Sequence, residues 1–589
     1  MKKLLFFILS VFALSSATAQ IIPQPKSESY GEGSFTITNK SCLVYNSAAR
    51  ESALYLLNYL PFKQILSSTK VMAGDIELSI NRYLDEEGYR LIVDKENIRI
   101  IGGSNAGVFN GIQTLLQLLP PQIYSGNVKL PISVPYCTIE DSPKFAYRGF
   151  MLDVARTWIS TDKVKRYIDL MSYLKLNKLH FHLTDDEGWR IEIKSHPELA
   201  QIGGFRGGDS PVFPRYGKFD EKWGGYYTQQ ELKDIVAYAA QRNIEIIPEI
   251  DMPGHMRACK KAMGTLLTDS AFDQRVYLSA QNYTDNVIDV TKPYAITFID
   301  HVITEIVKMH EEAGHPLTIF NIGGDEVPKG SLTQEEHQAF IDGVLAILKR
   351  YNLQPMGWEE ITHFCPPESK AICYSWLNSN TKPLEMAEAG YPVVLANANR
   401  LYFDFAYCNH HEEKGLNWGG YTDEYRSFDW EPLIHPNVVG MNAQLWGEVI
   451  RSFAQVEWQI YPKIYGLAER AWNNRSALTL GDYNKLVYEV FMPQLYAKNC
   501  NFHIQQPGIR VVDGMAVMNK VMKDGVVEYR FDEGDWMTYS EPVLVPADAK
   551  IIQAKVTYLG KESNTTWLWL ASQTQLDESV VEQNTGATF

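Results

Sequence analysis

The feature that most constrains the fold is a repeating pattern after Tyr147, in which short apolar runs alternate with longer amphipathic segments. Such alternation is typical of βα units built around a parallel sheet. Eight apolar runs can be counted, at residues 149–154, 179–184, 244–250, 318–323, 354–358, 371–376, 393–397 and 438–445. Eight strands in such a series predict an α/β fold with a closed (β/α)8 TIM barrel, which we assign to residues 144–506.

The segments between these runs carry the start signals of helices. Thr228 with Glu231, and Thr333 with Glu336, have the spacing of capping boxes, in which side chains satisfy the first free N–H groups of a helix. The segment after Ser160 has apolar side chains at helical spacing, namely Val164, Tyr167, Ile168, Met171 and Leu174. This stripe predicts a helix that packs against the outside of the barrel.

Smaller domains are expected on both sides of the barrel. Residues 20–143 combine strand-like runs (90–93 and 98–101) with a helical stretch at 107–119, which predicts an N-terminal α+β accessory domain. After helical runs at 459–472 and 483–496, residues 507–589 alternate apolar and polar positions, which predicts a small C-terminal β-sandwich-like domain. Such a domain could bind carbohydrate or brace the barrel, and we favour bracing.

The first residues have the order of a cleaved secretory signal. Lys2 and Lys3 precede an apolar run at 4–14, and Ala17-Thr18-Ala19 stands before Gln20. A transmembrane anchor, the alternative, requires about 20 apolar residues. We therefore predict a signal peptide at residues 1–19 and an exported protein without a transmembrane segment, either periplasmic or secreted.

Charge and cysteine content exclude some classes of function. The net charge of -15 argues against a nucleic-acid partner, because phosphate binding needs clustered Lys and Arg. The seven cysteines are scattered, so neither a disulfide framework nor a CxxC zinc site is expected. The sequence does not predict the oligomeric state.

Polar and aromatic side chains follow the predicted strands. The active site of a (β/α)8 barrel lies at the C-terminal ends of its strands, so these residues are the candidates for the site. In chain order they are Arg156, Asp185, Asp186, His255, Asp325, Glu326, Trp358, Trp376, Tyr402, Asp404, Trp446 and Glu448.

The most specific element is Gly323-Gly324-Asp325-Glu326. Two glycines allow a turn that points both carboxyl groups into the barrel mouth, where a strand would send them to opposite faces. Neighbouring carboxyls raise at least one pKa, and a carboxylic acid protonated near neutral pH is the proton donor that a glycosidic oxygen needs. The alternative is a solvated acidic turn.

His180 and His182 alternate along one predicted strand and so share a face. A metal site built on them would need a further ligand, which Asp185 or His255 could supply. Packing and hydrogen bonding inside the barrel is the interpretation we favour, and we expect neither a metal nor a cofactor.

Several stretches resemble motifs of the β-N-acetylhexosaminidases of glycoside hydrolase family 20. They are IPQP at 22–25, RGFMLDVAR at 148–156, HFHLTDD at 180–186, PEIDMPGH at 248–255, GGDE at 323–326, GWEE at 357–360 and QLWGE at 444–448. The resemblance covers nearly the whole mature chain and keeps the order of the motifs. It implies an exo-acting enzyme that removes terminal, non-reducing β-linked GlcNAc or GalNAc from glycans with retention of configuration.

The resemblance also implies roles for individual residues. Glu326 would be the general acid and base. The nucleophile would be the substrate's own acetamide oxygen, which gives an oxazolinium intermediate, as in the substrate-assisted exceptions among glycosidases. Asp325 would accept the acetamide N–H, and Tyr402 would donate to the acetamide oxygen. Asp185 and His255 would form an auxiliary pair that tunes the proton affinity of Glu326.

The same resemblance implies a set of substrate-binding residues. Three tryptophans would wall the pocket, and three charged residues would bind sugar hydroxyls, with Asp404 on an outer one. These residues are Trp358, Trp376, Trp446, Arg156, Asp404 and Glu448.

One position departs from the family, because Asn321 stands where histidine is usual. Asparagine can still form hydrogen bonds but carries no proton at neutral pH, so the buried network is affected more than the reaction. An inactive glycan-binding protein is one alternative, although Asp325, Glu326 and Tyr402 are all retained. An endo-acting or disaccharide-releasing enzyme is another, and the loop at 203–227 would then shape a more open site.

Overall fold

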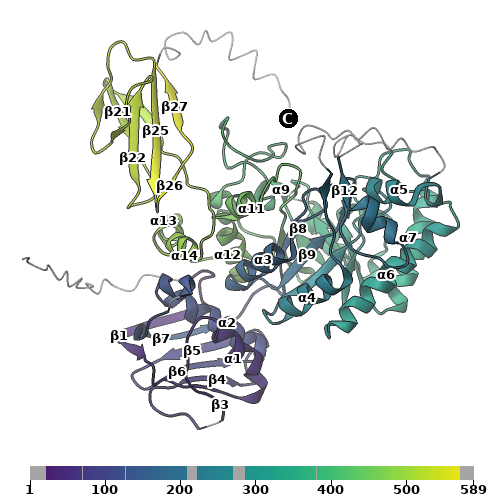
Figure 1. Cartoon of the computed structure of the whole chain (residues 1–589), viewed down its shortest axis with the longest axis horizontal. Helices are drawn as coiled ribbons and strands as arrows, with labels where there is room; N and C mark the ends of the chain where they lie inside the picture. The colour runs from purple at the N-terminus through teal and green to yellow at the C-terminus, as the bar shows by residue number, and fades with distance from the viewer. Residues whose placement is uncertain are drawn as a thin grey trace, which may run out of the picture.

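The structure is a computed structural model that describes residues 21–68, 70–126, 128–207, 222–268, 285–379 and 381–570. It contains an N-terminal domain, a barrel and a C-terminal β domain (Figure 1). The predicted signal peptide, the middle of the loop at 203–227 and the last residues of the chain lie outside the described residues. Among the described residues, no helix has the length and apolar character needed to cross a membrane.

The N-terminal domain is a seven-stranded mixed sheet with the order β1-β7-β5-β6-β4-β2-β3. Its strands are β1 (Ser27–Ile37), β2 (Leu43–Tyr45), β3 (Ile65–Ser67), β4 (Ile76–Ile80), β5 (Tyr89–Val93), β6 (Ile98–Gly102) and β7 (Ile132–Asp141). Helix α2 (Asn105–Leu118) packs on β4, β5 and β6, and α1 (Arg50–Leu56) packs on α2. The helix lies close to the sheet because Gly111 has no side chain, and a Cβ there would be 2.5 Å from Ile100 Cγ2.

The barrel is closed by eight parallel strands in the order β14-β15-β16-β17-β18-β19-β8-β9. They are β8 (Tyr147–Asp153), β9 (Lys178–His182), β14 (Glu245–Glu249), β15 (Ile319–Asn321), β16 (Gln354–Trp358), β17 (Ile372–Ser375), β18 (Val393–Leu395) and β19 (Val438–Ala443). Each coincides with one of the eight predicted runs to within a few residues, so the predicted TIM barrel is confirmed.

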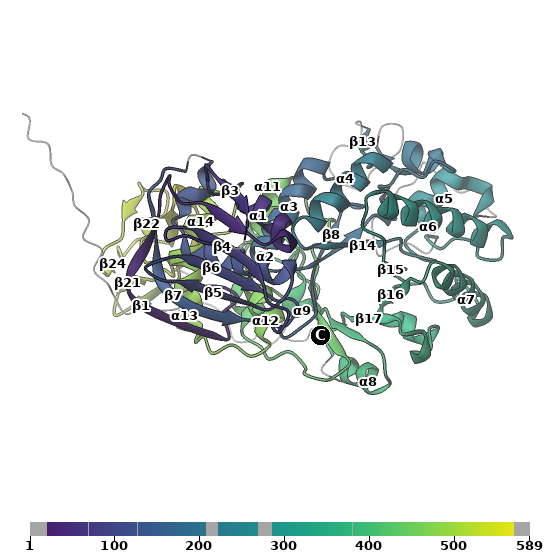
Figure 2. The same cartoon turned by 90° about the horizontal axis from the view of Figure 1, so that it is seen from below.

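Helices cover the outside of the barrel, and Figure 2 shows α6 and α7 outside the strands β14 to β17. The outer layer includes α3 (Thr161–Tyr173), α4 (Gln229–Ala240), α6 (Tyr294–Glu312), α7 (Gln334–Arg350) and α8 (Lys382–Glu388). Shorter helices lie in the segments after β14 and β18, namely α5 (Arg257–Met263), α9 (Ala398–Leu401) and α10 (Glu424–Phe428). Both predicted capping boxes are present, at the starts of α4 and α7. The stripe after Ser160 is buried on α3 as expected.

The predicted helical run at 459–472 is wrong in one respect, because it is interrupted. Helix α11 (Phe453–Ile460) ends before Pro462, and α12 (Ile464–Asn473) begins after it. Proline has no N–H to donate within a helix, which explains the break. The run at 483–496 likewise divides into α13 (Leu480–Lys485), a π-helical turn (Leu486–Phe491) and α14 (Met492–Ala497).

The C-terminal domain consists of two small antiparallel sheets. Their strands are β20 (Ile509–Val512), β21 (Met515–Met518), β22 (Val526–Phe531), β23 (Met537–Thr538), β24 (Val543–Leu544), β25 (Ile551–Tyr558), β26 (Lys561–Glu562) and β27 (Thr566–Trp569). The loop after β18 contacts this domain directly. His410 Nε2 donates to Thr565 O at 2.7 Å, and Asn564 Nδ2 donates to Glu413 Oε1 at 2.9 Å.

An apolar cluster inside the barrel separates its two ends. Its buried members include Tyr147, Ile247, Ile319, Met356, Trp358, Ile372, Tyr374 and Val394. Tyr147 and Tyr374 join across the barrel through their hydroxyls, which lie 2.6 Å apart. Trp358 is part of this cluster, so the polar residues described below rest on a packed apolar floor.

Candidate active site

The turn after β15 has the predicted geometry. Gly323 and Gly324 have φ values of +66° and +91°, and Glu326 itself has φ +48°. The side chain of Asp251 holds this turn, because its Oδ1 accepts the N–H of Gly324 at 3.0 Å. A non-glycine residue with positive φ is a strained conformation of the kind that gathers at functional sites. The turn therefore presents Asp325 and Glu326 side by side at the C-terminal end of the strand.

His255 lies against both of these carboxylates. Its Nε2 is 3.6 Å from Glu326 Oε2 and 3.9 Å from Asp325 Oδ2. On the other side of the ring, Nδ1 is 3.1 Å from Asp185 Oδ1. The sequence predicted this auxiliary pair, and the structure brings Asp185, His255 and Glu326 together in that order.

Arg156 joins the same group of residues from the end of β8. Its guanidinium is 2.7 Å from Asp185 Oδ2, 3.1 Å from Glu187 Oε2 and 3.3 Å from Asp153 Oδ2. Its Cζ also lies 5.0 Å from the centre of the Trp446 ring. The side chain is 1% exposed, so protein carboxylates and an indole surround much of this predicted sugar-binding residue.

Aromatic rings form one side of the site. Trp446 is 5.5 Å from Trp358 and 6.1 Å from Tyr402, measured between ring centres. Trp376 joins this group through Trp418, which lies 6.2 Å from Trp376 and 5.9 Å from Tyr402. Trp418 was not predicted from the sequence. It is 56% exposed, which is unusual for a tryptophan and leaves its face accessible beside the predicted aromatic wall.

Several buried polar side-chain atoms at this end of the barrel have no hydrogen-bond partner among the described residues. Three of them are Asp325 Oδ1, His255 Nε2 and Asp404 Oδ2. Buried polar groups in proteins are nearly always paired, so each exception calls for an explanation. A polar ligand that binds at this end of the barrel would pair all three. Glu448 lies in the same layer and acts electrostatically on both Arg156 and Asp404.

The pKa values are strongly perturbed. Burial raises the pKa of Asp325 well above its usual value, and the nearby Asp251 raises it further. Burial also acts to raise the pKa of Glu326, but the facing His255 outweighs it and holds that pKa below its usual value. The expectation that at least one of the two carboxyls has a raised pKa is met by Asp325, but not by Glu326, the predicted proton donor.

Two neighbouring groups, His255 and Glu448, also have shifted pKa values. Burial alone would lower the pKa of His255, but Asp185 opposes it and raises that pKa well above the usual value. Burial raises the pKa of Glu448 to about 7, although Arg156 acts against it. Groups with perturbed pKa values at the C-terminal end of a barrel are candidates for acid–base chemistry.

In the part of the chain that the structure describes, three groups of side chains bring potential metal ligands within 4.8 Å of one another. They are His180, His182 and Glu249; Asp185, Asp251 and His255; and His255, Asp325 and Glu326. In the first group, Glu249 completes the two-histidine face that the sequence suggested, in place of Asp185 or His255. The nitrogens face the carboxylate at hydrogen-bond distance, with 2.6 Å between His180 Nε2 and Glu249 Oε2. This geometry fits a network of hydrogen bonds.

Sequence reasoning missed several residues of the site. Glu249 and Asp251 lie at the end of β14, within a stretch already singled out, but were given no role. Glu360 follows β16, where its Oε2 accepts the Trp376 Nε1 proton at 3.2 Å. Burial and the nearby Asp325 raise the pKa of Glu360 to about 8. The available signal was position, because each follows or ends a barrel strand.

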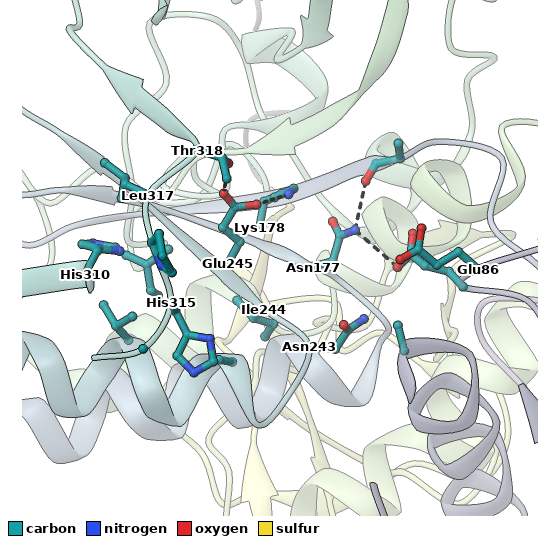
Figure 3. Close-up of a pocket in the computed structure, with 18 residues that line it drawn as sticks. Glu86, Asn177, Lys178, Asn243, Ile244, Glu245, His310, His315, Leu317 and Thr318 are labelled. Carbon is teal, nitrogen blue, oxygen red and sulfur yellow. Dashed lines mark hydrogen bonds and ion pairs between the residues drawn. The ribbon is translucent and has the colours of Figure 1, made fainter. Parts of the chain in front are cut away.

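A cavity of 570 Å³ lies at the opposite end of the barrel, against the N-terminal domain (Figure 3). Glu245, at the start of β14, binds both Lys178 and Thr318 there. None of the predicted site residues lines this cavity. The C-terminal end of the barrel is therefore the better candidate for the active site.

Comparison with known proteins identifies the family of the chain. Residues 145–475 match the profile of the glycosyl hydrolase family 20 catalytic domain, and residues 18–142 match domain 2 of that family. A β-hexosaminidase of Vibrio furnissii is 36% identical over 482 residues, which cover 77% of each chain.

Solved structures are also similar. A family 20 exo-β-N-acetylglucosaminidase of Vibrio harveyi in complex with N-acetylglucosamine superposes with a TM-score of 0.74, at 33% identity, over 83% of this chain and 79% of that one. A β-N-acetylhexosaminidase of Streptomyces coelicolor gives a TM-score of 0.73 at 31% identity, over 84% and 99% of the two chains. The chain therefore belongs to glycosyl hydrolase family 20, and it is an exo-acting β-N-acetylhexosaminidase.

Proposed function

We propose that this site hydrolyses terminal β-linked N-acetylhexosamine by a substrate-assisted, retaining mechanism, with Glu326 as general acid and base. The observation that carries this proposal is the arrangement of Asp325 and Glu326 on one turn, with His255 Nε2 within 3.9 Å of both carboxylates. In the first step Glu326 donates a proton to the leaving oxygen. In the second it removes a proton from water.

The proton on Glu326 is shared with His255. In the ligand-free site His255 holds the pKa of Glu326 low, although burial acts to raise it. A bound sugar excludes water from Glu326, and desolvation favours the neutral carboxylic acid. Substrate binding thus moves the shared proton toward Glu326, across the 3.6 Å between the two side chains.

Asp325 supports the attack of the acetamide oxygen on the anomeric carbon. Its unpaired Oδ1 is an acceptor for the acetamide N–H. Positive charge develops on the acetamido group as the oxazolinium forms. This charge favours the ionised form of Asp325, against the burial and the Asp251 charge that raise its pKa, and the carboxylate then stabilises the oxazolinium. The Tyr402 hydroxyl donates a hydrogen bond to the acetamide oxygen and holds this oxygen in line for attack.

Sugar recognition falls to the residues around this centre. Asp404, whose Oδ2 has no partner among the described residues, accepts an outer hydroxyl. Arg156 and Glu448 bind ring hydroxyls, and Trp358, Trp376 and Trp446 supply apolar contact to the sugar faces and the acetamide methyl. The partners are glycans or glycoconjugates with a terminal N-acetylhexosamine.

The test compares wild type, Glu326→Gln and Asp325→Asn on nitrophenyl β-N-acetylglucosaminide and β-N-acetylgalactosaminide. The nitrophenyl β-glucoside, which has no acetamido group, is the control substrate. Each variant is expected to lose about 10² or more in kcat, as for a lost proton donor or charge partner. The glucoside is expected to remain unhydrolysed. A wild type that binds the acetamido sugars without cleaving them would favour the glycan-binding alternative.

We further propose that the chain is exported, to the periplasm or beyond, after cleavage between Ala19 and Gln20. The support is the order of charged, apolar and small residues at the N-terminus. Mass spectrometry of the protein recovered from its source tests this proposal. A recovered chain that still carries residues 1–19 would contradict it.

A further inference from the structure

A buried carboxylate below the catalytic residues binds three side chains from two other strands. Glu249 ends β14 and is 0% exposed. Its Oε2 accepts protons from His180 Nε2 at 2.6 Å and from His182 Nδ1, and its Oε1 accepts from Trp358 Nε1 at 3.0 Å. An unpaired buried charge is costly, and the three donors offset that cost. Together they hold the Glu249 carboxylate in one position inside the barrel.

His182 is bound by carboxylates on both ring nitrogens. Nδ1 faces Glu249, and Nε2 lies 2.8 Å from Asp185 Oδ2. A neutral imidazole has one N–H only, so two carboxylate partners favour the doubly protonated ring. Arg156 Nη1 also approaches Nε2, but at 3.4 Å it is farther away than Asp185 Oδ2. Burial opposes that charge, but Glu249 and Asp185 raise the pKa of His182 well above its usual value. His182 is therefore a buried imidazolium between two anions.

The chain of contacts continues to the catalytic carboxylate. Asp185 contacts His182 through Oδ2 and His255 Nδ1 through Oδ1, the latter at 3.1 Å. His255 Nε2 in turn lies 3.6 Å from Glu326 Oε2. Other charges surround the chain, namely Arg156, Asp153, Glu187, Asp186 and Asp251. Of these, Arg156 binds Asp185 directly, so the Asp185 charge has two cationic partners besides His255.

The register of the barrel produces this arrangement. Glu249 is aligned with His182 on one neighbouring strand and with Asn321 on the other. Asn321 Nδ2 lies 3.1 Å from His180 Nε2, and its Oδ1 accepts the N–H of Gly323 at 2.9 Å. Glu249 is thus hydrogen-bonded to His182 on the His255 side, and it is aligned with Asn321, whose Oδ1 holds the turn that carries Asp325 and Glu326.

We propose that Glu249 is a positioning residue for the hydrolysis, whose carboxylate keeps His182 doubly protonated and thereby fixes the Asp185–His255 pair against Glu326. This inference rests on the proposed role of Glu326. Glu249 does not touch the substrate, and its effect passes through His182 and Asp185 to the proton shared by His255 and Glu326.

Glu249→Gln is the variant that tests the link. Glutamine has the same shape, but one of its two acceptor atoms becomes an NH2 donor. If the NH2 group takes the place of Oε2, it meets His180 Nε2 and His182 Nδ1. The His180 ring can carry its proton on Nδ1, which has no hydrogen-bond partner among the described residues. His182 Nε2 faces Asp185, so His182 must instead give up its Nδ1 proton. His182 then becomes neutral, and the Asp185 charge acts more strongly on His255.

The first measurement is NMR of the full chain labelled with 15N-histidine. In the wild type both ring nitrogens of His182 are expected to carry protons, and His182→Gln identifies these signals by removing them. In Glu249→Gln, one of the two N–H signals is expected to disappear. Two persisting N–H signals would overturn the proposal.

The second measurement is the pH dependence of kcat and kcat/KM. Glu249→Gln is expected to lower kcat at least about tenfold, part of the usual contribution of acid catalysis, with little change in KM. The alkaline limb is expected to move to higher pH, because His255 keeps its proton longer. A change in KM alone would indicate that Glu249 acts only through Trp358, and would also overturn the proposal.

Glu245→Gln is the matched control, because it makes the same change at the other end of β14, where Glu245 binds Lys178 and Thr318. It is expected to leave kcat and the His182 signals unchanged. If Glu249→Gln does not fold, His182→Gln tests the proposal instead, because glutamine can still donate to Asp185 but lacks the positive charge of His182. It is expected to reproduce the loss of kcat and the shifted limb, and wild-type behaviour would refute the inference. If Glu326→Gln is inactive while Glu249→Gln and His182→Gln both match the wild type, the inference fails and the proposed function stands.

Discussion

Replacing Gly324 with alanine tests how strictly the catalytic turn depends on its backbone. Gly324 has φ +91°, and a Cβ there would lie 2.5 Å from Ile361 Cγ2. An alanine in a left-handed conformation costs about 1–2 kcal/mol. The overlap with Ile361 is roughly 1 Å relative to an ordinary carbon contact, so the turn or Ile361 must move by about that distance. A displacement of 1 Å at a reacting group costs about 10²-fold in rate.

Gly330 offers a matched control, since its φ is +86° and an added Cβ would meet nothing within 4 Å. We expect Gly330→Ala to lose about 1–2 kcal/mol of stability in urea unfolding, and Gly324→Ala to lose more, because the overlap with Ile361 adds to the backbone cost. Only Gly324→Ala is expected to lose about 10² in kcat/KM on nitrophenyl β-N-acetylglucosaminide. The further change Ile361→Ala removes Cγ2 and should restore part of that loss. Equal kcat/KM in the two glycine variants would refute the reasoning.

Three further predictions concern the surroundings of the site. Glu413→Ala removes the acceptor of Asn564 Nδ2 and of His503 Nε2, each at 2.9 Å. It is expected to lower Tm and raise KM, because the loop that follows Asp404 loses its hydrogen bond to the C-terminal domain. Unchanged kinetics would argue that this domain does not brace the barrel. Dialysis against EDTA is expected to leave kcat unchanged, because the clustered histidines and carboxylates hydrogen-bond one another, and a loss that Zn²⁺ restores would contradict this. Burial and Asp325 raise the pKa of Glu360 to about 8, above the usual value of about 4.3, so the folded protein loses stability as pH rises between those values. Glu360→Gln is therefore expected to match the wild-type Tm near pH 4 and to exceed it above about pH 8; a Tm difference that does not change with pH would refute this assignment.

The barrel could be predicted from the sequence because its signals are local. Short apolar runs, amphipathic segments and capping boxes each depend on neighbouring residues, and they placed all eight strands and the starts of α4 and α7. The interrupted helix at Pro462 shows the limit, because a stripe of apolar residues continued across a residue that cannot donate its hydrogen bond. The candidate site residues could also be named, because each follows a strand end.

What the sequence could not supply was the set of contacts between strands. The residues 153, 182, 249 and 321 are far apart in the chain, yet the register of adjacent parallel strands aligns them in one layer. That alignment places Glu249 against His182, whose second carboxylate partner, Asp185, lies three residues along the chain. Asp251, just beyond the same strand, holds the Gly323–Gly324 turn from the neighbouring strand. The sequence by itself determined the barrel and the chemical groups at its mouth, whereas only the tertiary structure decided which charges meet, because barrel closure sets the register between strands.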